Sequence, residues 1–149
     1  TNGAFAVKKT DGTVVSWGWC EQSCVSTSVQ PELTSVETVY TNSNAFAAKR
    51  TDGRIVTWGF SFEGGDSAKV QPQLTSVDTI YSTHSAFAAK RTDGSVVTWG
   101  FQTEVQPQLT SVDTISATAS AFAAKKKDGS VVVWGKVDRK PDGSLATWG

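Results

Sequence analysis

The stretch "AFAAKRTDGSVVTWG" at residues 86–100 has the pattern of a β-hairpin whose turn is written in the sequence. Two short runs with aromatic and β-branched residues flank Asp93 and Gly94. An Asp-Gly pair favours a hairpin turn because glycine accepts a positive φ and aspartate tolerates one. Nearly the same fifteen letters stand at 45–59 and 121–135, so the chain repeats one hairpin.

The copies recur with a regular period. Their Ala-Phe pairs begin at residues 4, 45, 86 and 121, spacings of 41, 41 and 35, and a Trp-Gly pair follows each in step. A lone hairpin is marginal in water, so each copy is expected to bury its Phe, Val and Trp against the next. We therefore expect a single repeat domain over residues 1–149, with units at 4–44, 45–85, 86–120 and 121–149.

Repeats of about forty residues favour an all-β repeat protein, a small propeller-like ring or arc of about four blades. A β-trefoil has a similar length and repeat but needs threefold symmetry, whereas the chain has four Ala-Phe hairpins. A third strand is expected at 36–41, 77–82 and 112–117, where polar and apolar residues alternate. The "VQPEL" or "VQPQL" stretch before it contains proline, which indicates an edge strand or a connector.

The units resemble the repeats of the regulator of chromosome condensation family, most clearly in "VDTIYSTHSAFAAKRTDGSVVTWG" at 77–100. The resemblance covers nearly the whole chain and implies a β-propeller built from short, divergent blades. Members of that family that act in nucleotide exchange have longer blades and a "GQLG"-like motif after Trp-Gly. This chain has only "GGDS" at 64–67, so neither exchange activity nor chromatin binding is carried over.

The overall charge excludes some classes of partner. Fourteen Lys and Arg balance fourteen Asp and Glu, so no global field attracts nucleic acid. No apolar run reaches the length of a transmembrane helix. The chain lacks Met and opens where a repeat begins, which favours a processed product or a piece of a longer chain, expected outside the cytosol: secreted, at the surface or in an organelle lumen.

No catalytic, metal or cofactor site is expected. His84 is the only histidine, and we interpret it as a loop residue. Each repeated aspartate precedes a turn glycine and is assigned a structural role. Glu63 and Asp66 in "FEGGDS" give a weak calcium signal, and a plain flexible loop is preferred. Cys20 and Cys24 have no second cysteine pair or nearby histidine to complete a zinc site. They are interpreted as a local disulfide, with free thiols as the alternative.

Two groups of aromatic residues differ in their expected roles. The Trp of each Trp-Gly pair is expected to belong to the core: Trp17, Trp58, Trp99, Trp134 and Trp148. Four more aromatics fall in the variable loops just after these pairs: Trp19, Phe60, Phe62 and Phe101. Two readings stay open for the loop aromatics, which either fold back onto the blades or anchor an interface.

Basic pairs recur before each turn. They form a candidate basic band: Lys8, Lys9, Lys49, Arg50, Lys90, Arg91, Lys125 and Lys126. In a ring these residues would gather on one side and meet an acidic or phosphate-bearing partner. The alternative is that lysines protect hairpin shoulders and exposed edges from aggregation.

Taken together, these features predict a non-catalytic interaction or assembly module that binds protein through the loops after Trp-Gly. An accessory subunit of a larger complex, including a membrane-associated one, fits the divergence of these loops. The alternative is a secreted carbohydrate-binding module, which would need similar pockets in several copies.

Overall fold

A computed structural model describes residues 1, 3–18, 26–101, 103 and 109–136. Its strands are β1 (Ala4–Lys8), β2 (Val14–Gly18), β3 (Val36–Thr41), β4 (Ala45–Arg50), β5 (Ile55–Gly59), β6 (Val77–Ser82), β7 (Ala86–Arg91), β8 (Val96–Gly100), β9 (Val112–Ala117), β10 (Ala121–Lys126) and β11 (Val131–Gly135). Four short 3-10 turns connect them: η1 (Ser26–Ser28), η2 (Gln30–Glu32), η3 (Ser61–Glu63) and η4 (Gln71–Gln73).

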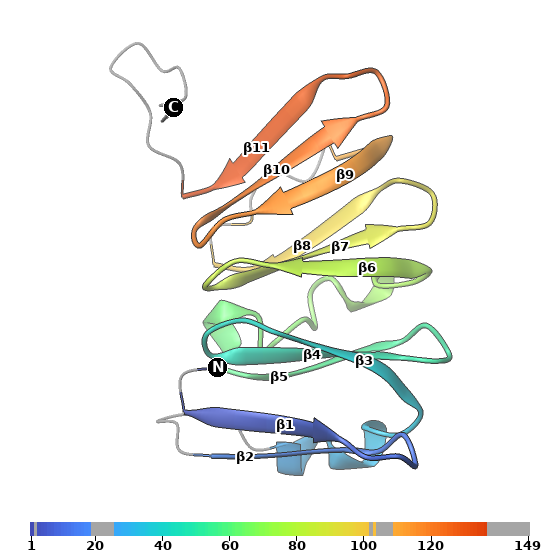
Figure 1. Cartoon of the computed structure of the whole chain (residues 1–149), viewed down its shortest axis with the longest axis vertical. Helices are drawn as coiled ribbons and strands as arrows, with labels where there is room; N and C mark the ends of the chain where they lie inside the picture. Colours follow the sequence, from blue (N-terminus) through green and yellow to red (C-terminus); the bar gives the residue numbers. More distant parts are fainter. Residues whose placement is uncertain (2, 19–25, 102, 104–108, 137–149) are drawn as a thin grey trace.

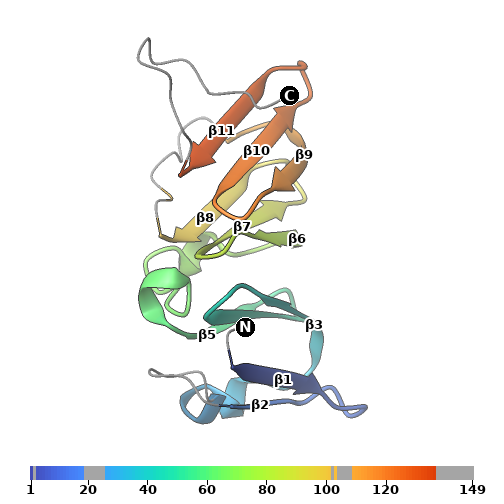
Figure 2. The ribbon, with the colours of Figure 1, turned by 60° about the vertical axis from the view of Figure 1, so that its left-hand side comes forward.

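The strands form four antiparallel sheets in chain order, β1-β2, β3-β4-β5, β6-β7-β8 and β9-β10-β11. The sheets stack face to face, each turned relative to the last, with β1-β2 at one end and β11 at the other (Figures 1 and 2). The all-β propeller-like class is confirmed, and the described residues form an open arc of blades. The trefoil alternative is wrong, because the repeats build four separate sheets without threefold symmetry.

Each Asp-Gly pair closes a hairpin with a three-residue loop. In the third sheet the Arg91 amide donates to the Ser95 carbonyl at 2.8 Å, and the Gly94 amide donates to the Arg91 carbonyl at 3.0 Å. Gly94 has φ +81°, the left-handed value that this loop type requires of its last residue. The Asp93 carboxylate accepts from the Ser95 amide at 2.8 Å, so the aspartate fastens its own turn.

The Trp-Gly glycine lies where two strands come too close for a side chain. In the second sheet Gly59 pairs with Ala45, and its φ is +113°. A Cβ atom on Gly59 would lie 2.5 Å from the Asn44 carbonyl oxygen and 2.7 Å from the Ala45 Cα atom. This close approach explains why glycine follows tryptophan in every copy.

Alternation along the strands gives each sheet two different faces. We call them the aromatic face, which carries the Phe and Trp of each copy, and the alanine face on the other side. The alanine face carries the alanines directly before and after that Phe, such as Ala45 and Ala47. Phe87 and Trp99 stack with ring centroids 5.3 Å apart and lie in one apolar cluster with Ala45 and Ala47 of the preceding sheet. The same arrangement joins the first sheet to the second and the third to the fourth. Each sheet therefore places its aromatic face on the alanine face before it.

One expected core tryptophan is on the surface. Trp58, Trp99 and Trp134 are at most 3% exposed, as expected, but Trp17 is 51% exposed. The prediction for Trp17 is wrong because no described sheet precedes β1-β2 to cover its aromatic face (Figure 1). Trp148 lies outside the described residues.

Two of the three proline-containing stretches are connectors and not edge strands, and the third, at 105–109, lies outside the described residues except for Leu109. Residues 30–32 and 71–73 form the 3-10 turns η2 and η4. The Gln71 side chain donates to the Ile55 carbonyl at 2.8 Å and accepts from the Ser67 hydroxyl. Gln30 makes the equivalent bond to the Val14 carbonyl. The connectors therefore satisfy edge groups of β5 and β2 that a neighbouring strand would otherwise bind.

Candidate functional site

The loop after β5 presents aromatic side chains to solvent. Phe62 is 75% exposed and Phe101, which follows β8, is 56% exposed. Phe60 is half-buried, with its ring 5.9 Å from that of Phe62. Of the two readings left open for the loop aromatics, folding back therefore describes only Phe60. Trp19 lies outside the described residues.

Phe62 is carried by a segment that is tied firmly to both neighbouring sheets. The Gly64 carbonyl accepts a 3.1 Å hydrogen bond from the Trp99 indole, and a Cβ atom on Gly64 would lie 2.6 Å from the Phe87 ring. The Glu63 carboxylate accepts from the Asn44 side chain at 2.6 Å. The loop expected to be plain and flexible is thus held in place by specific contacts.

A groove lies between this segment and the third sheet, and we call it the Phe62 groove. Its volume is about 490 Å³. Phe62, Asp66, Lys69 and Val70 line one side, and Thr98–Gly100 of β8 contribute to the other. An apolar ring beside groups of both charge signs suits a side chain of a protein partner, since large aromatics and a polar rim are typical of binding surfaces.

Three lysines of the candidate basic band connect neighbouring sheets. The ammonium of Lys8 donates to the Glu37 carbonyl at 2.8 Å, and that of Lys49 donates to the Asp78 carbonyl at 2.9 Å. Lys90 makes the same bond to the Asp113 carbonyl. Each bond runs from one sheet to the next sheet along the chain, so these lysines hold the arc together.

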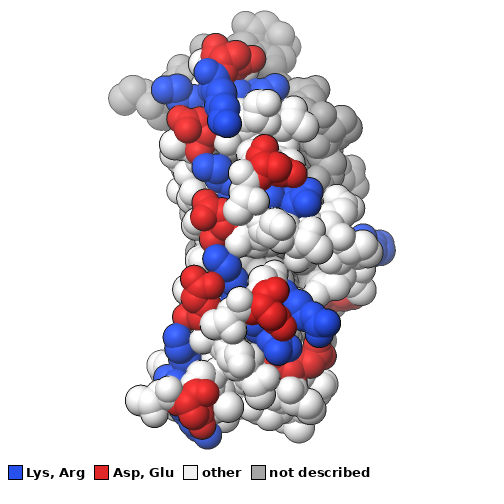
Figure 3. Space-filling view, turned by 90° about the vertical axis from the view of Figure 1, so that its right-hand side faces the viewer, with Lys and Arg blue, Asp and Glu red and all other residues white. Residues whose placement is uncertain are grey.

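The candidate band is not uniformly positive. Lys49 lies 3.5 Å from the Glu37 carboxylate, and Arg50 lies 3.2 Å from that of Asp52. Charges of both signs follow one another along this side of the array (Figure 3). The expected positive band is therefore replaced by a mixed one, because acidic residues of the third strand and of the turn stand beside the basic ones.

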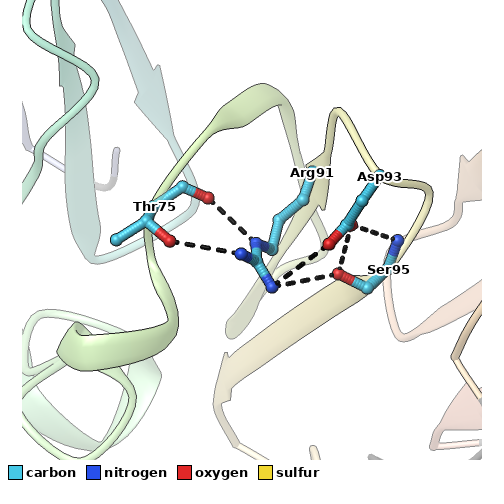
Figure 4. A network of polar contacts seen from close by, with 4 residues as sticks. All are labelled: Thr75, Arg91, Asp93 and Ser95. Carbon is cyan, nitrogen blue, oxygen red and sulfur yellow. Dashed lines mark hydrogen bonds and ion pairs between the residues drawn. The ribbon is translucent and has the colours of Figure 1, made fainter.

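Arg91 shows how such a basic residue is used. Its Nε donates to the Thr75 carbonyl at 2.9 Å, and its other nitrogens reach the Thr75 hydroxyl, the Ser95 hydroxyl and, at 3.5 Å, the Asp93 carboxylate (Figure 4). The guanidinium thus joins the hairpin turn to the connector of its own sheet. These contacts assign Arg91 a structural role.

The turn aspartates have lowered pKa values for a local reason. The pKa of Asp93 lies below its ordinary value of 3.8, first because the Ser95 hydroxyl donates to its carboxylate and then because the Ser95 amide does, with Arg91 adding to both. Asp11 and Asp128 have lowered pKa values through Thr13 and Ser130 in the same way. The sequence interpretation of these aspartates as turn residues agrees with these bonds.

We expect Ser95→Ala to raise the pKa of Asp93 toward 3.8, because the hydroxyl donor is lost. The pKa of Asp128 should stay unchanged, and Ser130→Ala should give the reverse pattern. A group with a lowered folded pKa stabilises the fold above its unfolded pKa and loses that contribution as the pH falls through the folded value. NMR titration of the carboxyl carbons measures both pKa values, and an Asp93 pKa that does not respond to Ser95→Ala contradicts the assignment.

The remaining candidates do not converge on a reaction centre. His84 is exposed, and its backbone accepts from the Ser43 amide and donates to the Ala119 carbonyl, which links three sheets. Within residues 1–136, gaps excepted, no three His, Cys, Asp or Glu residues gather as a metal site would require. Cys20 and Cys24 lie outside the described residues, so the disulfide stays a prediction.

This architecture of repeated sheets, with aromatic faces packed on alanine faces, defines the chain as a β-propeller repeat protein. No protein-family profile matches the sequence, and no curated protein matches it. Solved structures do match. They include the CRINKLY WD40 ectodomain of the Arabidopsis thaliana receptor kinase ACR4, with 17% identity and a TM-score of 0.59 over 97% of this chain and 50% of that chain.

Two further structures have the same likeness. Yeast RCC1 (Prp20), solved bound to Kap60, is 13% identical with a TM-score of 0.62 over 89% of this chain and 42% of that chain. Human WBSCR16 is 19% identical with a TM-score of 0.55 over 90% of this chain and 46% of that chain. At these identities the likeness establishes the fold, and the chain spans about half the length of these structures or less.

The part of the chain that the structure describes contains no helix long and apolar enough to cross a bilayer.

Proposed function

We propose that the chain is a non-catalytic protein-binding module whose contact surface is the Phe62 groove together with Phe101. One observation carries the proposal: Phe62 is 75% exposed although the backbone beneath it is fixed by the Gly64 and Glu63 contacts. Exposed aromatic side chains on a rigid support are costly in water and concentrate binding energy when a partner covers them.

The position of the groove supports a single specific partner. Phe62 and the Gly64-Gly65 pair belong to one copy of the repeat, and the loops after the other Trp-Gly pairs have different sequences. A multivalent lectin would repeat its pocket, so this divergence favours a protein partner over a glycan. We propose further that the chain is an accessory subunit of a larger complex, and this extension rests on the same divergence. The proposed location outside the cytosol rests instead on the predicted disulfide between Cys20 and Cys24.

A photo-crosslinking amino acid at position 62 tests the proposal in an extract of the source organism. We expect it to capture a protein that the same group at Thr114 does not capture. Thr114 is also exposed but lies on β9, away from the groove. Equal labelling from both positions, or labelling of neither, overturns the proposal. Specific binding on a glycan array with no protein captured would favour the carbohydrate-binding alternative.

For the captured protein, Phe62→Ala combined with Phe101→Ala should weaken binding by about 2 kcal/mol or more, roughly 30-fold in Kd. Both side chains are exposed, so far-UV circular dichroism should not change. Thr92→Ala is the control, since Thr92 is also exposed but lies in the hairpin turn of the third sheet, away from the groove and from the first sheet. Isothermal titration calorimetry measures the three affinities, and an unchanged Kd for the double variant contradicts the assignment of the groove.

A further inference from the structure

The first sheet leaves its aromatic face open. Phe5, Val7 and Trp17 are 64%, 45% and 51% exposed, whereas Phe46 and Trp58 at the equivalent positions of the second sheet are 1% and 3% exposed. The rings of Phe5 and Trp17 are 6.3 Å apart and tilted, while those of the covered pairs stack at 5.0–5.3 Å. This apolar surface is what each later sheet buries.

No described residue covers the alanine face of the fourth sheet. Ala121 and Ala123 are half-buried and Val131 is 61% exposed. Their counterparts in the second sheet are Ala45, Ala47 and Ile55, which are at most 1% exposed because Phe87 and Trp99 cover them. Val133 stands where the three earlier sheets have Ser or Thr, so this last alanine face has the most apolar composition of the four.

The two open faces complement each other. The contact of an aromatic face with an alanine face occurs three times inside the chain, so its geometry is already built into the fold. The described residues carry one copy of each half, at opposite ends of the arc (Figure 1). A second molecule therefore offers the missing half at each end.

We propose that two copies of the chain associate head to tail, with Phe5 and Trp17 of one copy seated on Ala121, Ala123 and Val131 of the other. A head-to-tail contact forms a ring where the rotation closes and a filament where it does not. The chain spans 42–50% of propeller structures that share its fold at TM-scores of 0.59–0.62. Since the chain is about half as long as these structures, two copies supply about enough sheets for one ring, and we expect a closed dimer with two equal interfaces.

The proposed interface lacks one hydrogen bond that the interfaces within the chain make. β3, β6 and β9 supply the carbonyl that accepts from a lysine of the preceding sheet, whereas no described residue adds such a third strand to β1-β2. Lys125 is exposed at the position of Lys90 and has no partner among the described residues. The apolar contact between the faces therefore supplies the affinity, and the intermolecular joint lacks the lysine bond.

Multi-angle light scattering on the purified 149-residue chain tests the proposal. We expect a mass twice the monomer's 15.8 kDa. Trp17→Glu and Val131→Glu should each halve that mass, because either change places a carboxylate in the joint. Phe62→Glu is the matched control and should leave the dimer intact. Both substituted positions are more than half exposed in the single chain, so circular dichroism should confirm that each variant folds.

Mixing the two monomeric variants separates this arrangement from others. The Trp17→Glu chain keeps a normal alanine face and the Val131→Glu chain keeps a normal aromatic face, so the mixture should form a one-to-one dimer through one intact joint. A wild-type chain that stays monomeric up to millimolar concentration overturns the proposal. So does a Val131→Glu chain that still dimerises alone, since that result indicates contact between two aromatic faces.

Discussion

Replacing Phe87 by alanine is expected to destabilise the protein by about 3–5 kcal/mol, the usual cost of deleting a buried phenylalanine ring. Phe87 is 0% exposed, stacks on Trp99 and contacts the alanine face of the second sheet. Its loss opens a cavity in the middle of the array, between the second and third sheets. Urea denaturation followed by tryptophan fluorescence measures the change in the free energy of unfolding.

Phe5→Ala provides a control at the same repeat position. Phe5 is 64% exposed and buries little area within its own chain, so the cost should stay below about 1 kcal/mol. The comparison is made on protein dilute enough to be monomeric. Equal costs for Phe5→Ala and Phe87→Ala would show that another part of the chain covers the first sheet.

The second large effect is expected from Gly59→Ala, at about 3 kcal/mol or more. Two costs add, because the new Cβ atom overlaps the Asn44 carbonyl at 2.5 Å and because a residue with a side chain must hold φ +113°. The opposing atoms belong to the backbone of β4 and the residue before it, so relief requires the strands to separate. The melting temperature and the urea midpoint should both fall.

Gly53→Ala separates the two costs. Gly53 has φ +82° in the turn of the same hairpin, but a Cβ atom there would meet nothing within 4 Å. Only the backbone strain remains, which is about 1–2 kcal/mol. If Gly53→Ala and Gly59→Ala cost the same, the close approach of the Trp-Gly glycine to β4 does not contribute to stability.

Much of the fold follows from local patterns that repeat. The Asp-Gly turn, the alternation in "AFAAK" and the Trp-Gly pair each act within one sheet. Each copy therefore predicts the same hairpin by itself. Four agreeing copies indicated the hairpins and the number of sheets, and three copies indicated the third strand. The two roles left open for "VQPQL" were resolved only by the structure, because the choice depends on Gln71 reaching the Ile55 carbonyl of another segment.

The predictions that were wrong concern residues whose surroundings depend on the neighbouring sheet. Trp17 has the sequence context of Trp58 and Trp99, and it is exposed because no described sheet covers it. The basic band was inferred from Lys and Arg positions alone, although each third strand brings Glu37, Asp78 or Asp113 alongside. The sequence could not decide whether Phe62 is exposed or buried, because its exposure depends on the close approach of Gly64 to the Phe87 ring.

The packing of aromatic on alanine faces also makes the chain modular in evolution. Since every joint uses the same two surfaces, removing residues 86–120 would bring the Phe122 and Trp134 pair against Ala45 and Ala47, which already receive such a pair. Whole units can therefore be duplicated or deleted in frame without a new interface having to arise. Growth and shortening by whole units of about forty residues keeps every joint the same, and the spacings of 41, 41 and 35 show that the stretch between hairpins can differ in length.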